Sequence, residues 1–314
     1  MNIKMLKSLR HVYGKVLVEE GKKNNNIIAL EADLKASTQS IQFETAFTER
    51  FFEVGIAEQN MIGIAAGLAR CGKIPVVHSF ASFISMKACE QIRTSIASQN
   101  LNVKIVASHA GVSSASAGTT HHAIEDIAIM RSIPNMKVLV PGDSLDMENC
   151  IKEMINTIGP VYLRISASDV PDIIDIGIPH NIDEPYLLSG GKDLSIFTTG
   201  ITLSIGYELV ELFKKDNLTV KHLHFSCIKP IANEIIKSVA SESKVIYTIE
   251  DHNIIGGFGS AVTEVVAELG NCKVFRLGIN DHFCVAASQK YIFEQEGLTV
   301  QSIYKRVKQQ LGCI

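Results

Sequence analysis

An acidic residue stands at the start of one of the most apolar helical segments of the sequence. Residues 55–60, GIAEQN, open a predicted helix that continues MIGIAAGLA, and this stretch is so small and apolar on every side that we expect it to be buried. Glu58 then has two interpretations. It is either a solvated residue favoured by the partial positive charge of the first helical turn, or a desolvated carboxyl that shares a proton with a basic nitrogen of a ligand.

Two phenylalanines and a methionine follow the next predicted strand. In HSFASFISM (78–86), Phe80, Phe83 and Met86 stand three residues apart, and on a helix this spacing places them on one face. The spacing alone favours ordinary core packing. The functional alternative is a flat apolar wall for an aromatic ring.

A loop of small and polar residues, 108–122, holds three of the ten histidines: His109, His121 and His122. Small residues let a ligand approach the backbone, and loops that follow strands are where α/β proteins place their sites. A metal site is disfavoured here, because adjacent histidines in an extended loop point to opposite sides and no carboxylate or cysteine completes a ligand set. Hydrogen bonding to a substrate, or proton transfer by one histidine, fits better.

Glycines cluster once more in the second half, at Gly256-Gly257-Phe258-Gly259-Ser260, between the strand end IEDH (249–252) and a predicted helix. The spacing matches neither the dinucleotide fingerprint nor the P-loop, and no lysine follows. A tight turn that packs a helix on a sheet is therefore favoured over a phosphate cradle.

The elements that must position these residues alternate between short β-branched runs and longer helical periods, which predicts an α/β fold with parallel sheets covered on both faces. Strands are expected at 27–30, 75–79, 103–108, 137–140, 161–165, 194–199, 219–225, 244–249 and 272–277. Helices are expected at 5–21, 57–71, 84–99, 123–131, 144–157, 201–215, 231–241, 258–269 and 288–311. The segment 176–192 reads as a linker between two doubly wound domains, 1–175 and 193–314.

The composition agrees with two soluble domains. The 314 residues are about twice a typical domain of ~150, and 30 basic against 33 acidic residues give a net charge of −3, which offers no electrostatic footprint for nucleic acid. No apolar run reaches the ~18 residues of a membrane span, so we expect a cytoplasmic protein with no membrane partner. Seven widely spaced cysteines without a CxxC pair indicate neither a disulfide framework nor a zinc site.

Taken in order, these segments resemble the C-terminal half of transketolase, namely its pyrimidine-binding domain followed by its C-terminal domain. The resemblance covers essentially the whole chain. The segment EDHNIIGGFGSAV (250–262) also looks like the deoxyxylulose-phosphate synthases and the β subunits of 2-oxoacid dehydrogenases. The segments that carry the likeness are ALEADLKAS (29–37), FFEVGIAEQNMIGIAAGLA (51–69), HSFASF (78–83), SHAG (108–111), GTTHHAIED (118–126), LVPGDS (139–144) and GPVYLRIS (159–166).

The resemblance implies thiamine diphosphate as the cofactor. Glu58 matches the glutamate that hydrogen-bonds N1′ of the cofactor's aminopyrimidine and promotes its imino tautomer, and desolvation suits a carboxyl in that role. Phe80 and Phe83 match the aromatic bed of the pyrimidine, with Met86 where a tyrosine is common. Asp33 matches a carboxylate of the family's subunit interface near the cofactor.

The resemblance also implies a phosphorylated sugar as substrate. His121 matches the catalytic-loop histidine that contacts the C1 hydroxyl and carbonyl oxygen of the donor. One position departs from the pattern: Ala117 stands where transketolases usually carry an aspartate that reads a sugar hydroxyl. The positions that match the grip on the phosphate end are Arg10, Ser37, His109 and Arg164.

A larger departure is that no GDG triplet, the signature of the diphosphate-binding domain, occurs in the chain. We therefore expect a split transketolase, inactive alone, whose partner chain carries that domain and holds Mg²⁺ (or Ca²⁺), so that no metal is bound by this chain, in an α₂β₂ heterotetramer. Alternatives are the β subunit of a 2-oxoacid dehydrogenase-like or deoxyxylulose-phosphate-synthase-like enzyme, and a catalytically silent assembly subunit. Retention of Glu58 argues against the last.

Overall fold

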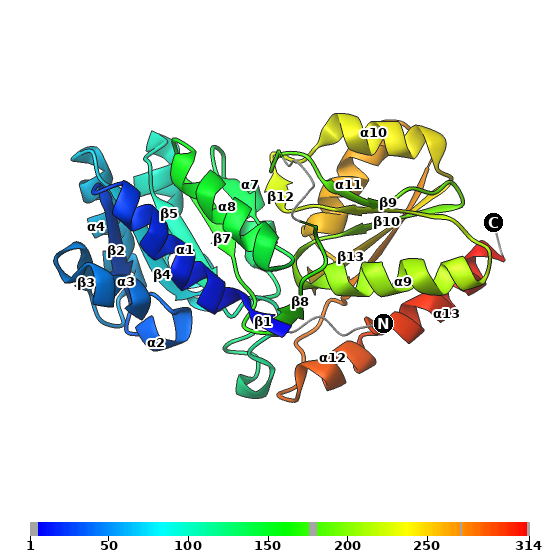
Figure 1. Cartoon of the computed structure of the whole chain (residues 1–314), viewed down its shortest axis with the longest axis horizontal. Helices are drawn as coiled ribbons and strands as arrows, with labels where there is room; N and C mark the ends of the chain where they lie inside the picture. Colours follow the sequence, from blue (N-terminus) through cyan, green and yellow to red (C-terminus); the bar gives the residue numbers. More distant parts are fainter. Residues whose placement is uncertain (1–5, 176–180, 271, 313–314) are drawn as a thin grey trace.

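The computed structural model describes residues 6–175, 181–270 and 272–312. These residues form two α/β halves that lie side by side, each with a sheet covered by helices on both faces (Figure 1). The predicted fold class is confirmed. None of the helices formed by the described residues is both long and apolar enough to cross a bilayer.

The sheet of the first half is almost entirely parallel. Among the described residues it contains seven strands in the order β12-β6-β7-β5-β4-β2-β3, and only β12 runs antiparallel to its neighbour. The strands are β2 (Ile27–Glu31), β3 (Phe51–Glu53), β4 (Ile74–Phe80), β5 (Lys104–Ser108), β6 (Lys137–Leu139), β7 (Val161–Arg164) and β12 (Cys227–Lys229).

Successive residues of a strand are buried on opposite faces of this sheet, which explains why helices cover both faces. Along β2, Ile28 and Leu30 enter one apolar core while Ile27 and Ala29 enter another. The first core lies under α4 (Glu58–Arg70), α5 (Ala81–Lys87) and α7 (Asp126–Ser132). The second lies under α1 (Leu9–Lys23), α3 (Ile41–Ala46) and α8 (Ser144–Asn156), and short helices α2 (Lys35–Thr38) and α6 (Cys89–Gln91) complete the half.

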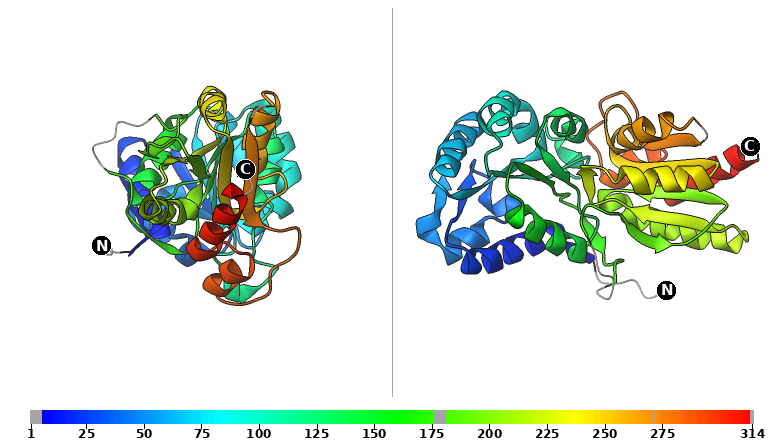
Figure 2. Two further views of the ribbon diagram at one scale, coloured as in Figure 1. Left: turned by 90° about the vertical axis from the view of Figure 1, so that its right-hand side faces the viewer. Right: turned by 90° about the horizontal axis from the view of Figure 1, so that it is seen from above.

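The second half repeats the design on a smaller sheet. Five described strands follow the order β14-β13-β10-β11-β9, antiparallel only at β9: β9 (Tyr186–Ser189), β10 (Leu194–Thr198), β11 (Val220–His224), β13 (Val245–Asn253) and β14 (Lys273–Ile279). Helices α9 (Leu203–Lys215) and α13 (Val300–Leu311) cover one face, and α10 (Asn233–Glu242) and α11 (Phe258–Ala267) cover the other (Figure 2).

The two halves share more than a border. Strand β12 comes from the second half of the chain but pairs with β6 of the first sheet. One apolar core also runs without a break from Ile127 in α7 to Phe258 and Val262 in α11. The halves therefore fold against each other through a continuous interior.

Two expectations about elements need correction. The segment read as a linker, 176–192, contributes β9, and residues 176–180 lie outside the described residues. Just before it, β8 (Asp169–Pro171) pairs with β1 (Leu6–Ser8). The helix expected over 288–311 is two helices, α12 (Gln289–Gln295) and α13, because Gly297 adopts a positive φ of 66° and Thr299 caps a new helix.

Helix α4 is also less buried than its apolar sequence predicts. Met61, Ile62 and Ala65 lie in the core, whereas Gly63 and Ile64 are exposed. In this chain the helix is therefore covered on one side only, and its second apolar side faces outward.

Candidate functional site

The carboxyl ends of neighbouring parallel strands bring most of the candidate residues to one edge of the first sheet. Asp33 follows β2, Glu58 follows β3, Phe80 ends β4 and His109 follows β5. In parallel α/β sheets the ligand site lies at this edge, because the loops there leave the strand ends side by side. The fold thus gathers residues that are up to 76 positions apart in sequence, as Asp33 and His109 are.

Glu58 is the first residue of α4, and it is buried. Its side chain is 1% exposed, so the interpretation as a solvated helix-start residue is wrong. Its Oε1 accepts a long hydrogen bond of 3.4 Å from Ser79 Oγ, and its Oε2 lies 2.5 Å from Lys87 Nζ. The site therefore contains a desolvated carboxylate with one close charged partner.

Lys87 is the residue that sequence reasoning missed. It ends α5, its side chain is 48% exposed, and its ammonium lies 5.4 Å from the centroid of the Phe83 ring. The ammonium thus lies beside both the Glu58 carboxylate and the aromatic pair. The ion pair joins positions 29 residues apart, and no motif in the sequence couples them.

Phe80 and Phe83 form the aromatic wall that the functional interpretation required. Their rings are stacked, with centroids 5.6 Å apart and planes at 26°. The His109 ring lies 3.9 Å from Phe80, and the His121 ring lies edge-on to Phe83 at 5.2 Å. Met86 is 49% exposed on the same helix, so its thioether is accessible to a ligand. The two stacked phenylalanine rings form a partly buried apolar surface, and the two imidazoles border it.

Arg10, Ser37 and His109 meet beside this wall. Arg10 Nη1 donates to the carbonyl oxygen of Ser37 at 2.8 Å and lies 3.4 Å from His109 Nε2. Arg10 Nε is buried without a hydrogen-bond partner, although a guanidinium N–H normally finds one. Burial, followed by the charge of Arg10 and the neighbouring His121, lowers the pKa of His109 to about 4, so this imidazole is neutral at neutral pH.

The backbone at His109 is also unusual, because a non-glycine residue here has φ = 57°. Such left-handed conformations persist only where the surroundings impose them, and they are frequent at ligand sites. The imidazole is held by Ser108 Oγ, 3.0 Å from its Nδ1. The ring orientation is therefore fixed from both sides, by Ser108 and by Phe80.

The two adjacent histidines of the loop have different partners. His121 Nδ1 lies 2.9 Å from Thr120 Oγ1 on the side of the aromatic wall, whereas His122 is buried with its Nε2 3.1 Å from the carbonyl oxygen of Ala115. The two imidazoles do not converge on one point. Only His121 therefore joins the candidate site.

Arg164 does not join this site, which corrects the expectation that it grips a phosphate. Its Nε donates to both oxygens of Asp126 at 2.9 and 3.1 Å, and its Nη1 donates to Asp251 Oδ1 at 2.8 Å. Its Nη2 donates to the carbonyl oxygens of Ala123 and Asp251. Burial opposes the charge, but the two carboxylates outweigh it and raise the pKa of Arg164. All three guanidinium nitrogens therefore donate within the chain, and those bonded to Asp251 join the two halves.

Asp33 lies at the same sheet edge but is exposed. Its backbone has φ = 62°, and its amide donates to Glu53 Oε1 at 2.8 Å. The structure therefore holds the main chain of Asp33 through Glu53 and leaves its carboxylate outward.

The glycine-rich segment after β13 is a structural turn, as the sequence favoured. The carboxylate of Glu250 accepts hydrogen bonds from the amides of Phe258, at 2.7 Å, and Gly259, at 2.8 Å. A Cβ at Gly257 would lie 2.2 Å from Glu250 Oε2, so only glycine allows this approach. The amides at this helix start, which could otherwise bind a phosphate, already donate to the carboxylate of Glu250.

The donor set fits one part of thiamine diphosphate, its aminopyrimidine. The buried Glu58 carboxylate can accept a hydrogen bond from a ring nitrogen, and the stacked Phe80 and Phe83 offer a flat apolar surface within reach of it. Arg10 Nε, in the neighbouring polar cluster, is buried and has no hydrogen-bond partner among the described residues.

Comparison with known proteins agrees with this geometry. Residues 7–172 match the model of the transketolase pyrimidine-binding domain, and residues 185–303 match that of the transketolase C-terminal domain. The chain is 42% identical over 308 residues, 97% of this chain and 96% of the relative, to a putative transketolase C-terminal section of Methanocaldococcus jannaschii. It is 36% identical over 299 residues to the 6-deoxy-6-sulfo-D-fructose transketolase subunit of a Clostridium species, covering 95% of this chain and 92% of that relative.

Solved structures give the same result. A split-gene transketolase, described as an inactive β₄ tetramer, superposes with a TM-score of 0.88 at 39% identity, over 97% of this chain and 98% of that one. Transketolase from Campylobacter jejuni shares the fold, with a TM-score of 0.83 at 17% identity, and this chain spans 47% of its length. The chain therefore belongs to the transketolase family, as a C-terminal subunit of the split type.

Proposed function

We propose that this chain is the catalytic C-terminal subunit of a split transketolase, which transfers a two-carbon ketol unit from a ketose phosphate to an aldose. The observation that carries the proposal is the buried Glu58 carboxylate beside the stacked Phe80 and Phe83 at the carboxyl edge of the sheet. Thiamine diphosphate, on which the family depends, supplies the nucleophilic carbon when bound. This chain contributes the surface for its pyrimidine.

The residues of the edge have separate tasks in this proposal. Glu58 accepts a hydrogen bond from N1′ of the pyrimidine and holds its proton there, while Phe80, Phe83 and Met86 contact the ring faces. Asp33, exposed at the same edge, faces the subunit interface. His121, on the loop against Phe83, hydrogen-bonds the donor's hydroxyl and carbonyl oxygens.

The anionic end of the sugar is held by the cluster of Arg10, Ser37 and His109. The charge comes from Arg10, while neutral His109 contributes a hydrogen bond. One relative is described as acting on a sulfofructose, and another, from Phocaeicola vulgatus and 32% identical, belongs to an apulose-4-phosphate transketolase. A terminal anion, phosphate or sulfonate, is common to these substrates, and Arg10 suits either.

A partner chain completes the enzyme in this proposal. It supplies the diphosphate-binding domain and the Mg²⁺ or Ca²⁺ ion, since this chain spans only 46–48% of single-chain transketolases and deoxyxylulose-phosphate synthases. The apolar side chains of Phe52, Ile56 and Ile64 are exposed around α4, and they offer a surface for assembly into an α₂β₂ heterotetramer.

The test is reconstitution with a chain that carries a GDG-type motif. The pair should co-purify and convert ketose phosphates in the presence of thiamine diphosphate and Mg²⁺, whereas this chain alone should not. Glu58→Gln should lower kcat by at least about 100-fold, as loss of a proton-holding group does. Glu49→Gln, at an exposed position, is the matched control and should leave kcat unchanged.

Two results would reject the proposal. Tight cofactor binding and turnover by the isolated chain would show that no partner is needed. Full activity of the Glu58→Gln pair would show that the carboxylate is not part of the chemistry, as expected for a silent assembly subunit.

A second candidate is a synthase that condenses pyruvate with an aldose phosphate. It is favoured by 35% identity over 299 residues to the 1-deoxy-D-xylulose-5-phosphate synthase of Desulfotalea psychrophila, of which this chain spans 46%. Assaying the reconstituted pair with pyruvate against ketose phosphates separates the candidates, including a 2-oxoacid dehydrogenase-like one. Carbon dioxide release from pyruvate, without ketose turnover, would favour the decarboxylating alternatives.

A further inference from the structure

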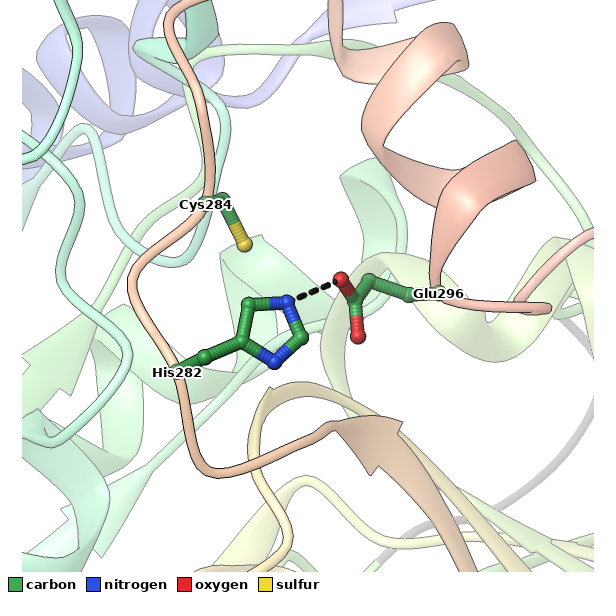
Figure 3. A group of neighbouring side chains, drawn as sticks. All are labelled: His282, Cys284 and Glu296. Carbon is green, nitrogen blue, oxygen red and sulfur yellow. Dashed lines mark hydrogen bonds and ion pairs between the residues drawn. The ribbon is translucent and has the colours of Figure 1, made fainter.

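The loop between β14 and α12 carries two side chains that point toward the end of α12. His282 and Cys284 come from the loop, and Glu296 follows the last residue of α12, so three chemically different ligands meet (Figure 3). Among the described residues, this is the single group of three whose His, Cys or carboxylate ligand atoms all lie within 4.8 Å of one another. It stands apart from the sheet edge that holds Glu58.

The burial of the group suits a bound cation. Cys284 is 4% exposed. The side chain of Glu296 is also buried, whereas that of His282 is 53% exposed. A dication that bound both the thiolate and the carboxylate would remove their mutual repulsion and would be reached from solvent on the His282 side.

The types of ligand atom indicate which metal ion the group would bind. One imidazole nitrogen, one thiolate sulfur and one carboxylate oxygen are the ligands of Zn²⁺, whereas Mg²⁺ and Ca²⁺ bind oxygen. Bond lengths of about 2.0–2.3 Å require the ligand atoms to lie roughly 3–4 Å apart. The three ligand atoms lie within 4.8 Å of one another. His282 Nε2 is already 2.7 Å from Glu296 Oε1, so a small separation of this pair would admit the ion.

The carboxylate is also oriented from behind. Both the backbone amide and the Nδ2 amide of Asn280 donate to Glu296 Oε2 at 3.2 Å, which leaves Oε1 directed at His282. Hydrogen bonds of this kind to the outer oxygen of a ligand carboxylate are typical of metal sites, where they fix its orientation.

We propose that His282, Cys284 and Glu296 bind one Zn²⁺ ion, with a fourth position open to water. Binding forms bonds from zinc to Nε2, Sγ and Oε1 and breaks the S–H bond of Cys284, whose proton passes to solvent. The imidazole proton that Nε2 shares with Glu296 Oε1 moves through solvent to Nδ1, and no electrons are transferred. The two negative charges of the thiolate and carboxylate balance the ion.

Such an ion would fasten the loop to α12 next to the candidate catalytic loop. The amide of Ala287 donates to the carbonyl oxygen of Ala115 at 3.2 Å, and Ala286 Cβ is the atom nearest to a Cβ built on Gly118. The zinc site therefore supports the surface against which the loop of His121 rests. This inference does not depend on the proposed function.

The first experiment measures zinc binding to the full chain after treatment with a chelator and desalting. Titration with Zn²⁺ against a chromophoric chelator should show one tight equivalent, with release of at least one proton per ion. Cys284→Ser and His282→Ala should each weaken binding by at least about tenfold. Cys71→Ser, at an exposed cysteine outside the group, is the matched control and should bind as the unaltered chain does.

Co²⁺ provides a spectroscopic check that does not depend on affinity. The unaltered chain should show thiolate-to-cobalt charge-transfer absorption in the near ultraviolet, and Cys284→Ser should lose it. Circular dichroism verifies that each variant is folded, and the half-exposed His282→Ala remains informative if Cys284→Ser does not fold.

Three outcomes would overturn the inference. These are no tight equivalent of zinc, zinc binding that is unchanged in both His282→Ala and Cys284→Ser, and a charge-transfer band that is lost in Cys71→Ser. Slower hydrogen exchange of residues 280–288 on adding Zn²⁺ would support the fastening role, whereas unchanged exchange would reject that role.

Discussion

The ion pair of Glu58 and Lys87 joins a buried carboxylate to an ammonium that is half exposed. At the scale of single residues this asymmetry matters, because water can replace the carboxylate around Lys87 but cannot reach Glu58. Removing the lysine therefore leaves the carboxylate with only the long hydrogen bond from Ser79.

We predict that Lys87→Met lowers the free energy of unfolding by about 1–3 kcal/mol, the cost of leaving a buried charged group without its partner. Glu58→Gln with Lys87→Met should cost less than the sum of the single changes, because the neutral amide no longer needs the ammonium. Urea unfolding of the four proteins in the cycle measures this coupling.

Lys35→Met is the control for this cycle, because the pair of Lys35 with Glu44 is partly exposed at both ends, and its loss should cost about 0–1 kcal/mol. Additivity of the Glu58 and Lys87 changes within about 0.5 kcal/mol would contradict the pairing.

At the scale of elements, the side chain of Asp143 holds two segments together, the start of α8 and residues 173–174. It caps α8 by accepting from the amide of Asp146 at 3.0 Å, and it also accepts from the amides of Ile173 at 2.9 Å and Ile174 at 2.7 Å. The segment that leaves the first half is thus tied to the start of α8.

Asp143→Ala should destabilise the chain by about 2 kcal/mol or more, since it removes a helix cap and leaves two further amides without their acceptor. Thr299→Ala removes the cap of α13 and the hydrogen bond from Thr299 to Ser302 Oγ, and it should cost about 1 kcal/mol. Comparison of the two by urea unfolding tests the additional role of Asp143, and equal losses would show that the segment 173–174 gains nothing from it.

At the scale of the whole molecule, Arg164 of the first half pairs with two buried carboxylates, Asp126 of the same half and Asp251 of β13, and the second pair connects the halves. Arg164→Met should lower the free energy of unfolding by about 3–5 kcal/mol, because both carboxylates lose their counter-ion. Combining it with Asp126→Asn and Asp251→Asn should recover part of this loss.

Arg131 provides the matched comparison, because it also joins the halves, through Glu264 of α11, whose side chain is 62% exposed. Arg131→Met should cost about 0–1 kcal/mol. Equal losses for the two arginines in denaturant unfolding would refute a special role for the buried network.

The pH dependence of stability is also a property of the whole chain. Burial lowers the pKa values of His78 and His252 to about 4 and that of His222 to about 3, below their ordinary value of 6.5. Below pH 6.5 these histidines bind protons in the unfolded chain, whereas in the folded chain they stay neutral until the pH reaches their lowered pKa values. Each histidine therefore reduces stability on acidification, by up to about 1.4 kcal/mol per pH unit.

Two buried carboxyls act in the opposite direction. Burial raises the pKa values of Glu31 and Glu250 to about 7, so their contribution to stability is present at low pH and is lost as the pH rises through about 7. The histidines outnumber these two carboxyls between pH 4.5 and 6.5. Above pH 7 the relevant group is Lys104, because burial lowers its pKa from 10.5 to about 7 and stability then rises with pH. The free energy of unfolding should therefore rise from pH 4.5 to 6.5 and rise again above pH 7, and a fall over the first of these ranges would contradict the assignment.

The sequence by itself determined the fold class, because alternating helical and strand periods are local patterns that predict the sheets. The spacing around Glu58, Phe80 and Phe83 favoured ordinary structural roles, and only the resemblance of GIAEQN and HSFASF to transketolases marked these residues as a site. The glycine-rich turn was also interpreted correctly. Its role follows from spacing alone, because the segment lies between a strand and a helix.

Only the tertiary structure decided which charged groups face one another. Arg164 matched a substrate-binding position, yet Asp251, 87 residues later, takes its guanidinium. Lys87 belongs to no recognisable motif. The sequence places His282 and Cys284 close together, but only the folded chain brings Glu296, 14 residues after His282, next to them. A charge, unlike hydrophobic periodicity, takes its role from partners distant in sequence, because its energy depends on separation and burial in space.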